Sequence, residues 1–136
     1  MILKTKGIVL SHIKYKETSI ITKIYTSEFG LRSYIVNGIR TKKSNGRLAL
    51  YQPLTILELD VYEQKTKNIQ RISDAKCAIP YHNIPFEIHK TTIAIFLAEF
   101  LYKLLQNAEE KDTQKYNFIE LSLEYFDKST EQINLF

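Results

Sequence analysis

The sequence predicts an α+β protein: an N-terminal five-stranded antiparallel β-barrel followed by the start of an α-helical domain. Five short runs of alternating or β-branched residues, joined by short connections, occupy the first 80 of the 136 residues. After Pro85 the apolar spacing becomes that of a helix. Short, closely connected strands favour a small barrel of the oligonucleotide/oligosaccharide-binding (OB) fold, with a five-stranded SH3-like barrel as the alternative. We expect an OB-fold at 1–80 and a truncated helical domain at 81–136.

The strands are expected at residues 5–12, 19–26, 31–39, 55–62 and 69–78. Gly30 can adopt the positive φ that a tight hairpin needs between the second and third strands. Gly38 indicates a bulge within the third strand. The fourth strand alternates cleanly, which predicts that Leu57, Leu59 and Val61 share one face.

Two helices are expected after residue 85. The first, at about 86–106, should be buried on more than one side, because its apolar positions form a wide face: Ile93, Ile95, Phe96, Leu97, Ala98, Phe100, Leu101, Tyr102, Leu104 and Leu105. Asp112 is a candidate N-cap for the second helix. That helix places Tyr116, Ile119, Leu123 and Phe126 at near-helical intervals. The short connector predicts antiparallel packing of the two helices.

Positive charge is concentrated in the predicted barrel. Residues 1–80 carry fourteen Lys and Arg against six acids, a net charge of +8, whereas residues 81–136 carry five Lys against nine acids, a net charge of −4. The loop after the third strand carries Arg40, Lys42, Lys43 and Arg47 without an acid, and Asn45-Gly46 suits a reversal at its tip. This asymmetry indicates that the barrel faces a polyanion, whose phosphates the loop could bind.

Further cations in the barrel alternate with aromatic residues. Lys14, Lys16 and Arg32 are additional candidates for phosphate contacts. Tyr15 and Phe29 lie in predicted turns and are candidates for stacking against bases. Single-stranded nucleic acid is held by this combination of cations and aromatic faces.

Catalytic and metal-binding patterns are weak. His12, His82 and His89 do not have the spacing of metal ligands on one helix, and the single Cys77 excludes an internal disulfide and a multi-cysteine zinc site. Glu58 and Asp60 share the outer face of one strand and could hold Mg²⁺, which leaves a nuclease as an alternative. We expect no enzyme activity, cofactor or metal. The absence of a signal peptide or long apolar run in the sequence predicts a cytoplasmic protein.

Several stretches resemble the RecO family of recombination mediators in order and spacing. They are 4–10, 16–19, 25–31, 37–40 with the basic loop after it, 51–54, 57–59, 79–81 and 97–102. The resemblance spans nearly the whole chain and implies an N-terminal OB-fold followed by a helical domain. Family members continue through a longer helical domain, often with a zinc-binding cysteine cluster that has no counterpart in this sequence.

The resemblance implies a bacterial, nucleoid-associated protein that binds single- and double-stranded DNA and promotes strand annealing. It also implies partners: RecR, single-strand-binding protein and the recombinase RecA, whose loading such proteins assist. The positions that match the family's basic surface are Arg40, Lys42, Lys43 and Arg47, with Lys14, Lys16 and Arg32 beside them. The sequence therefore favours a non-enzymatic DNA-binding module in DNA repair. The alternative is an adaptor that binds proteins through its apolar helical faces.

Overall fold

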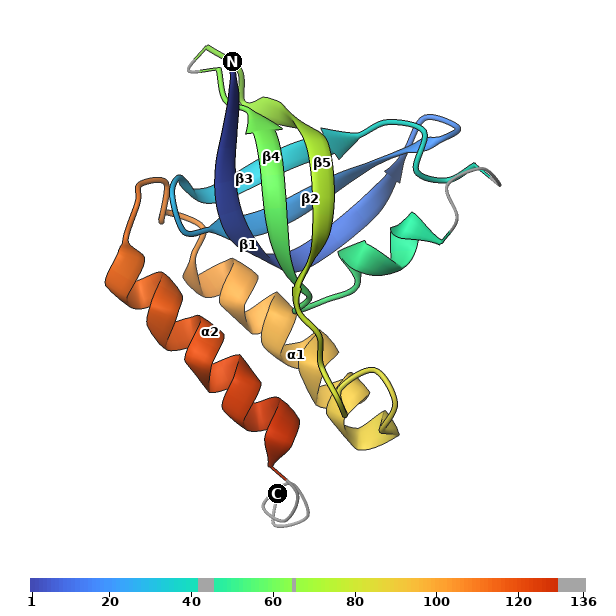
Figure 1. Cartoon of the computed structure of the whole chain (residues 1–136), viewed down its shortest axis with the longest axis vertical. Coiled ribbons are helices and arrows are strands. Elements are labelled where there is room, and N and C mark those ends of the chain that lie inside the picture. Colours follow the sequence, from blue (N-terminus) through green and yellow to red (C-terminus); the bar gives the residue numbers. More distant parts are fainter. Residues whose placement is uncertain (42–45, 65, 130–136) are drawn as a thin grey trace.

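The computed structural model describes residues 1–41, 46–64 and 66–129. Five strands form a closed barrel, and two helices lie against one side of it (Figure 1). The elements in chain order are β1 (Ile2–Tyr15), β2 (Ser19–Thr26), β3 (Gly30–Val36), the 3-10 helix η2 (Arg47–Tyr51), β4 (Ile56–Tyr62), β5 (Ile69–Ile79), α1 (Ile88–Leu104) and α2 (Thr113–Lys128). This arrangement confirms the predicted OB-type barrel followed by helices.

The barrel is not wholly antiparallel, which corrects the prediction. The strand order is β1-β2-β3-β5-β4, and β3 pairs with β5 in parallel over Ser33–Ile69, Tyr34–Gln70 and Ile35–Arg71. The other four pairings are antiparallel. Five strands arranged in a ring cannot alternate in direction all the way round, so closure requires at least one parallel pair.

Two strand boundaries also differ from the prediction. β1 begins at Ile2 and ends at Tyr15, because it pairs with β4 in its first half and with β2 in its second. β3 ends at Val36, so Gly38 lies beyond the strand with a φ of 67°, in a turn and not in a bulge. Gly30 has the predicted positive φ, at 72°.

The barrel interior is filled by the inward-facing residue of each pleat. Leu57, Leu59 and Val61 point inward together, as predicted, and pack with Val9 and Ile24 in one cluster. Tyr34 is also fully buried there. Burial raises the pKa of Tyr34, so this phenol stays neutral.

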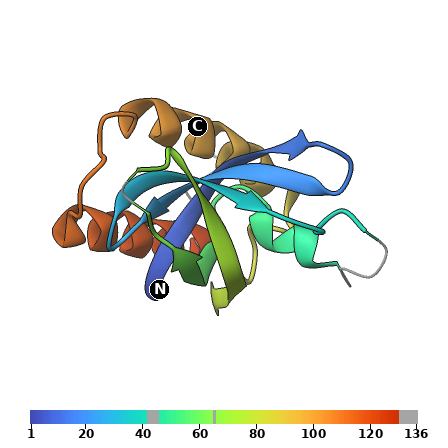
Figure 2. The same ribbon diagram turned by 90° about the horizontal axis from the view of Figure 1, so that it is seen from above.

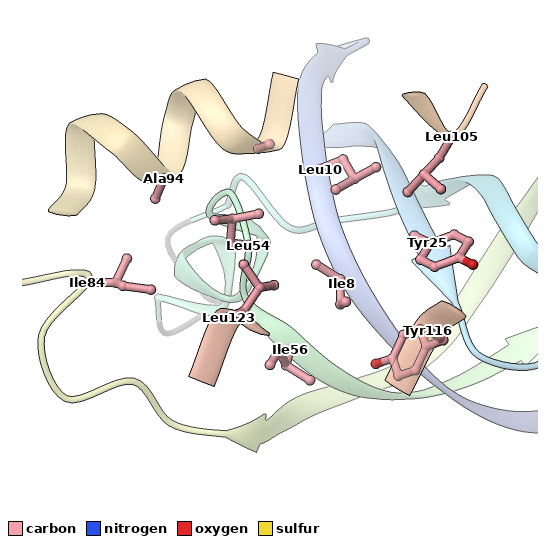
Figure 3. Close-up of a cluster of buried hydrophobic side chains, with 11 residues drawn as sticks. Ile8, Leu10, Tyr25, Leu54, Ile56, Ile84, Ala94, Leu105, Tyr116 and Leu123 are labelled. Carbon is pink, nitrogen blue, oxygen red and sulfur yellow. The ribbon is translucent and has the colours of Figure 1, made fainter. Parts of the chain in front are cut away.

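A second apolar cluster joins the outside of the barrel to the helices (Figure 3). Ile8 pairs with Tyr25 and faces the helices, and a register shift between Val9 and Ser11 lets Leu10 contribute to the same side. Such a bulge places two residues opposite one on the neighbouring strand. Tyr25 packs against Tyr116 of α2, with ring centroids 5.9 Å apart.

The helices use a narrower face than the sequence predicts. In α1 the buried residues include Ala94 and Ala98, whereas Phe96, Phe100 and Leu104 are 76%, 58% and 66% exposed. The expectation that α1 is buried on more than one side is wrong for these three residues and for Ile95, which is 55% exposed. Small side chains let the helix backbone approach the barrel closely, so the adjoining large residues point away from it. No helix in the described part of the chain is long and apolar enough to span a membrane.

The second helix agrees with its prediction. Asp112 caps α2 by accepting a hydrogen bond from the Lys115 amide, at 3.0 Å. Tyr116 and Leu123 are buried against the barrel, with Ile119 and Phe126 packed beside them. The two helices run antiparallel beneath the barrel (Figures 1 and 2).

A buried polar cluster fixes the end of α2. Lys90 of α1 is only 1% exposed, and its Nζ donates to the carbonyls of Phe126, Asp127 and Ser129. The Asp127 carboxylate accepts hydrogen bonds from the amides of His82, Asn83 and Ile84, each at 2.8 Å. Burial favours the neutral acid, but the three amide hydrogen bonds outweigh it and hold the pKa of Asp127 below its usual value.

Replacing Asp127 with Ala should destabilise the fold by about 3 kcal/mol, because it leaves the amides of His82, Asn83 and Ile84 without their acceptor and removes a negative charge that interacts with the buried Lys90 ammonium. Urea unfolding followed by circular dichroism measures this loss. Glu99→Ala is the control, since its pair with Lys103 is exposed on both sides and should contribute less than about 1 kcal/mol. Equal losses for the two variants would contradict the buried role of Asp127.

The same carboxylate should make stability depend on acid pH. The pKa of Asp127 is lower in the folded protein than in the unfolded chain, so its contribution is complete above about pH 4 and is lost as the pH falls through the folded value. The free energy of unfolding of the wild type should therefore fall more steeply below pH 4 than that of Asp127→Asn. Parallel curves for the two proteins would refute this linkage.

Gly30 should be the least replaceable glycine of the described turns. A Cβ there would lie 2.3 Å from the carbonyl oxygen of Ala108, which accepts from the Leu31 amide at 2.7 Å. Gly38→Ala shares the positive φ but meets nothing within 4 Å, so it should cost only the conformational strain of about 1–2 kcal/mol. Thermal melting should show a distinctly larger loss for Gly30→Ala, and equal losses would argue against the contact.

Candidate nucleic-acid interface

The basic residues of two distant segments meet at one end of the barrel. The turn at 16–18 joins β1 to β2, and the segment 37–41 follows β3 (Figure 1). The Arg40 amide donates to the Thr18 carbonyl at 2.9 Å, which joins the two segments directly. We call this region, with the described cations Lys14, Lys16, Arg40 and Arg47, the basic end.

The Arg40 side chain strengthens this junction. Its Nη1 donates to the Glu17 carbonyl at 2.8 Å and to the Lys16 carbonyl at 3.5 Å. Both acceptors are neutral, so the positive charge of Arg40 is not cancelled by them. Arg40 remains exposed, and its guanidinium carries further donors that suit phosphate oxygens.

Local sequence explains why the segment after β3 lies against the turn. Ile39 is 2% exposed and packs into the barrel cluster, which anchors the segment between two polar stretches. Gly38 supplies the positive φ that turns the chain, and the Thr41 hydroxyl donates to the Gly38 carbonyl at 3.1 Å. Ser19 at the start of β2 donates to the Asn37 side chain at 3.1 Å.

The β1–β2 turn presents a cation beside an aromatic ring. Lys16 has a φ of 55°, unusual for a residue with a side chain, and its Nζ lies 5.3 Å from the centre of the Tyr15 ring. Lys14 and Lys16 are exposed, and Tyr15 is half-buried. Within the described ranges, Lys14, Lys16 and Arg40 form no ion pair with a carboxylate.

Arg47 is the first residue of the 3-10 helix η2 and approaches the basic end from there. The sequence pattern did not predict this helix. Arg47 lines a hollow between η2 and β5 together with Arg71, Tyr62 and Asp74. The buried side chain of η2 is Tyr51, whose pKa burial raises to about 12. Lys42, Lys43 and Asn45 lie outside the described residues.

Two predicted binding residues lie elsewhere. Arg32 forms an ion pair with Glu63, 2.8 Å from Nε to Oε1, and donates to the Glu109 carbonyl at 2.8 Å. These contacts link β3 to the β4–β5 loop and to the α1–α2 connector. Phe29 is half-buried against the barrel cluster in the β2–β3 turn, at the opposite end of β2 from Tyr15.

The structure also identifies a cation that sequence reasoning missed. The Arg71 guanidinium carbon lies 4.5 Å from the centre of the Tyr62 ring, on adjacent strands. The sequence held an indication of this cation, since Arg71 occupies an outward position of β5. It was overlooked because the fifth strand has the weakest alternation of apolar and polar residues.

The residues considered for metal binding have other contacts. His12 Nδ1 lies 2.8 Å from the Tyr51 carbonyl oxygen, Asp60 pairs with Lys4, and Glu58 pairs with Lys76. Among the described residues, no group of three or more His, Cys, Asp or Glu side chains could hold a metal ion.

A small closed barrel of five strands in the order β1-β2-β3-β5-β4 is the architecture of the OB class, whose members bind oligonucleotides and oligosaccharides. Comparison with known proteins assigns the family. Residues 1–81 match the family model described as "Recombination protein O N terminal". The chain belongs to the RecO family of DNA repair and recombination proteins.

Individual relatives agree with this assignment. The chain is 39% identical over 135 residues to the DNA repair protein RecO of Flavobacterium psychrophilum, covering 98% of this chain and 56% of that protein. It is 36% identical over 136 residues to RecO of Phocaeicola vulgatus, covering 100% of this chain and 56% of the relative. The chain thus spans little more than half the length of these curated relatives.

Proposed function

We propose that this chain binds single- and double-stranded DNA through the basic end of its barrel, without catalysing a reaction. The observation that carries the proposal is the Arg40 junction, which gathers cations from two segments 24 residues apart. Each Lys or Arg that meets a phosphate releases a condensed counterion, so binding is driven by charge and is independent of base sequence. Lys42 and Lys43 lie between Arg40 and Arg47 in the sequence, so the proposal assigns them to the same interface.

Strand annealing follows from the same chemistry. Two complementary strands repel one another, and a surface that screens both backbones lowers this barrier without any catalytic group. By family resemblance, the proposed role includes assistance in loading the recombinase RecA, with RecR and single-strand-binding protein as partners and the bacterial cytoplasm as location.

The proposal assigns different roles to the candidate residues. Lys14, Lys16, Arg40 and Arg47 are the proposed phosphate contacts, and Tyr15 is the proposed stacking residue beside them. The ion pair of Arg32 with Glu63 favours a structural role for Arg32. The packing of Phe29 against the barrel cluster likewise favours a structural role over base stacking.

A charge-matched pair of quadruple variants tests the interface. Replacing Arg40, Lys42, Lys43 and Arg47 with Ala should weaken binding to all sequences alike. The slope of log affinity against log salt should become shallower by about 0.7 per lost contact on single strands and 0.9 on duplex. Fluorescence anisotropy titrations with labelled 20-mers at several salt concentrations measure both effects.

The control removes four exposed cations that pair with acids elsewhere: Lys4, Lys76, Lys103 and Lys111. It makes the same change in net charge, so only contacts at the basic end should separate the two variants. Equal slopes for the two quadruple variants would overturn the proposed interface.

The exposed apolar residues of the helices favour a second candidate role for this part of the chain, which is to pack against other protein segments. Phe96, Phe100 and Leu104 of α1 and Phe118, Leu121 and Tyr125 of α2 are all more than half exposed. We propose that residues 81–136 belong to a larger helical domain whose further helices pack on this face, as the greater length of the relatives suggests. An adaptor acting only through this face would show no DNA binding at low salt.

A further inference from the structure

One side of β5 is left open by the way the barrel closes. On its first side β5 pairs with β4 from Arg71 to Ile79. On its second side it pairs with β3 only from Ile69 to Arg71, just before β3 ends at Val36. Beyond Arg71, none of the described residues makes a backbone hydrogen bond to this second side. We call the stretch 72–77 the open edge.

The turn after β3 explains why the two strands part here. Gly38 has a φ of 67°, which turns the chain away from the direction of β3. The Arg40 amide then binds the Thr18 carbonyl, so the segment 37–41 runs to the β1–β2 turn and not along β5. The next described element, η2, contacts β5 on the side that faces away from β4 (Figure 1).

A hollow of about 300 Å³ lies along the open edge, between β5, the segment after β3 and η2. Two guanidinium groups line it, those of Arg47 and Arg71, against the single carboxylate of Asp74. Apolar and aromatic side chains form much of the remaining lining: Val36, Ile39, Leu50, Tyr51 and Ile72. The hollow is therefore largely apolar with an excess of positive charge.

The open edge presents backbone groups to this hollow. Every second residue of a strand turns its amide and its carbonyl to the same side, so an unpaired edge carries donors and acceptors in alternation. Another extended peptide matches this alternation with its own amides and carbonyls. A phosphate backbone offers only acceptors, so the open edge favours a peptide over a nucleic acid.

Two bulges limit the length of the segment that can add. The register between β4 and β5 shifts at Ser73 and again at Ala78, each of which is an extra residue in β5. Bulges twist a strand and interrupt regular pairing. The stretch Asp74–Cys77 between them is regular, so the open edge suits a short extended segment and not the edge of a whole sheet.

We infer that the open edge binds a short extended segment of a partner protein, which adds to the barrel as a further strand. Alternate side chains of the segment would enter the hollow, whose lining suits small apolar groups. The other side chains would face outward near the exposed Arg71, which suits acidic groups. The inference does not depend on DNA binding, and it concerns the barrel and not the exposed apolar face of the helices.

Amide hydrogen exchange, resolved for each residue by NMR, tests the open edge in the chain alone. Along Asp74–Cys77, amides turned toward β4 should exchange slowly. Those turned to the open side should exchange at least about tenfold faster, because they lack an acceptor. Uniform protection along this stretch would overturn the inference, since the edge would already be covered.

A peptide of alternating Val and Glu with blocked ends is the probe for the added strand. At about 1 mM it should slow the fast amides of the open edge at least about fivefold and leave the amides of the helices unchanged. The control is the same peptide with every amide N-methylated, which keeps the side chains and removes the donors. It should leave exchange at the open edge unchanged.

A charge exchange tests where the peptide lies. Arg71→Glu reverses an exposed charge at the start of the open edge, so it should weaken binding of the Val–Glu peptide about fivefold and strengthen binding of a Val–Lys peptide by a similar factor. Lys103→Glu reverses an exposed charge on α1 and should change neither affinity. Melting curves check that both variants are folded.

Each remaining outcome would count against the inference. A Val–Glu peptide that protects no amide of the open edge, or that acts no differently from its N-methylated form, would overturn it. Protection of the same amides by oligo-dT and not by the peptide would assign the edge to nucleic acid instead. The salt dependence of DNA binding plays no part in these readouts, so this inference and the proposed function can fail separately.

Discussion

The burial of apolar residues on both faces of β1 and β2 is the constraint on which the architecture depends. Val9 and Ile24 fill the barrel interior, while Ile8 and Tyr25 on the neighbouring pleats lie beneath the helices. A strand that is apolar on both faces must be covered on each side. The helices are therefore a necessary part of the hydrophobic core and not an addition to a barrel that is complete without them. The bulge at Leu10 increases this contact. The helices consequently cover one part of the outer surface of the barrel.

That division also organises the charges. The Arg32–Glu63 pair is located where the connector of the helices meets the barrel, whereas the Lys90–Asp127 cluster joins α1 to the end of α2 and to the segment 82–84. Both are directed to protein groups. Arg40 and Lys16 of the basic end contact neutral carbonyls and an aromatic ring instead, so these contacts do not cancel their charge.

Local pattern predicted most of the elements, because strand alternation and helix capping are encoded by neighbouring residues. Leu57, Leu59 and Val61, Gly30 and Asp112 all lie as their sequence context indicated. Long-range pairing was less accessible, because the parallel β3–β5 pair depends on the register between distant strands. Lys90 was missed because a lysine near the start of a helix is ordinarily solvated, and only the fold shows the three carbonyls that surround its ammonium. The same holds for Arg40, whose acceptors come from a turn 23 and 24 residues away.

The closed ring of strands limits how copies of this protein could assemble. An open sheet ends in a strand with unpaired amides and carbonyls, to which a strand of another chain can add. Here β4 returns to pair with β1 along seven residue pairs, so the first half of β1 has no free edge to offer to such an addition. Copies that met at this edge would therefore touch through side chains and could separate without breaking a sheet.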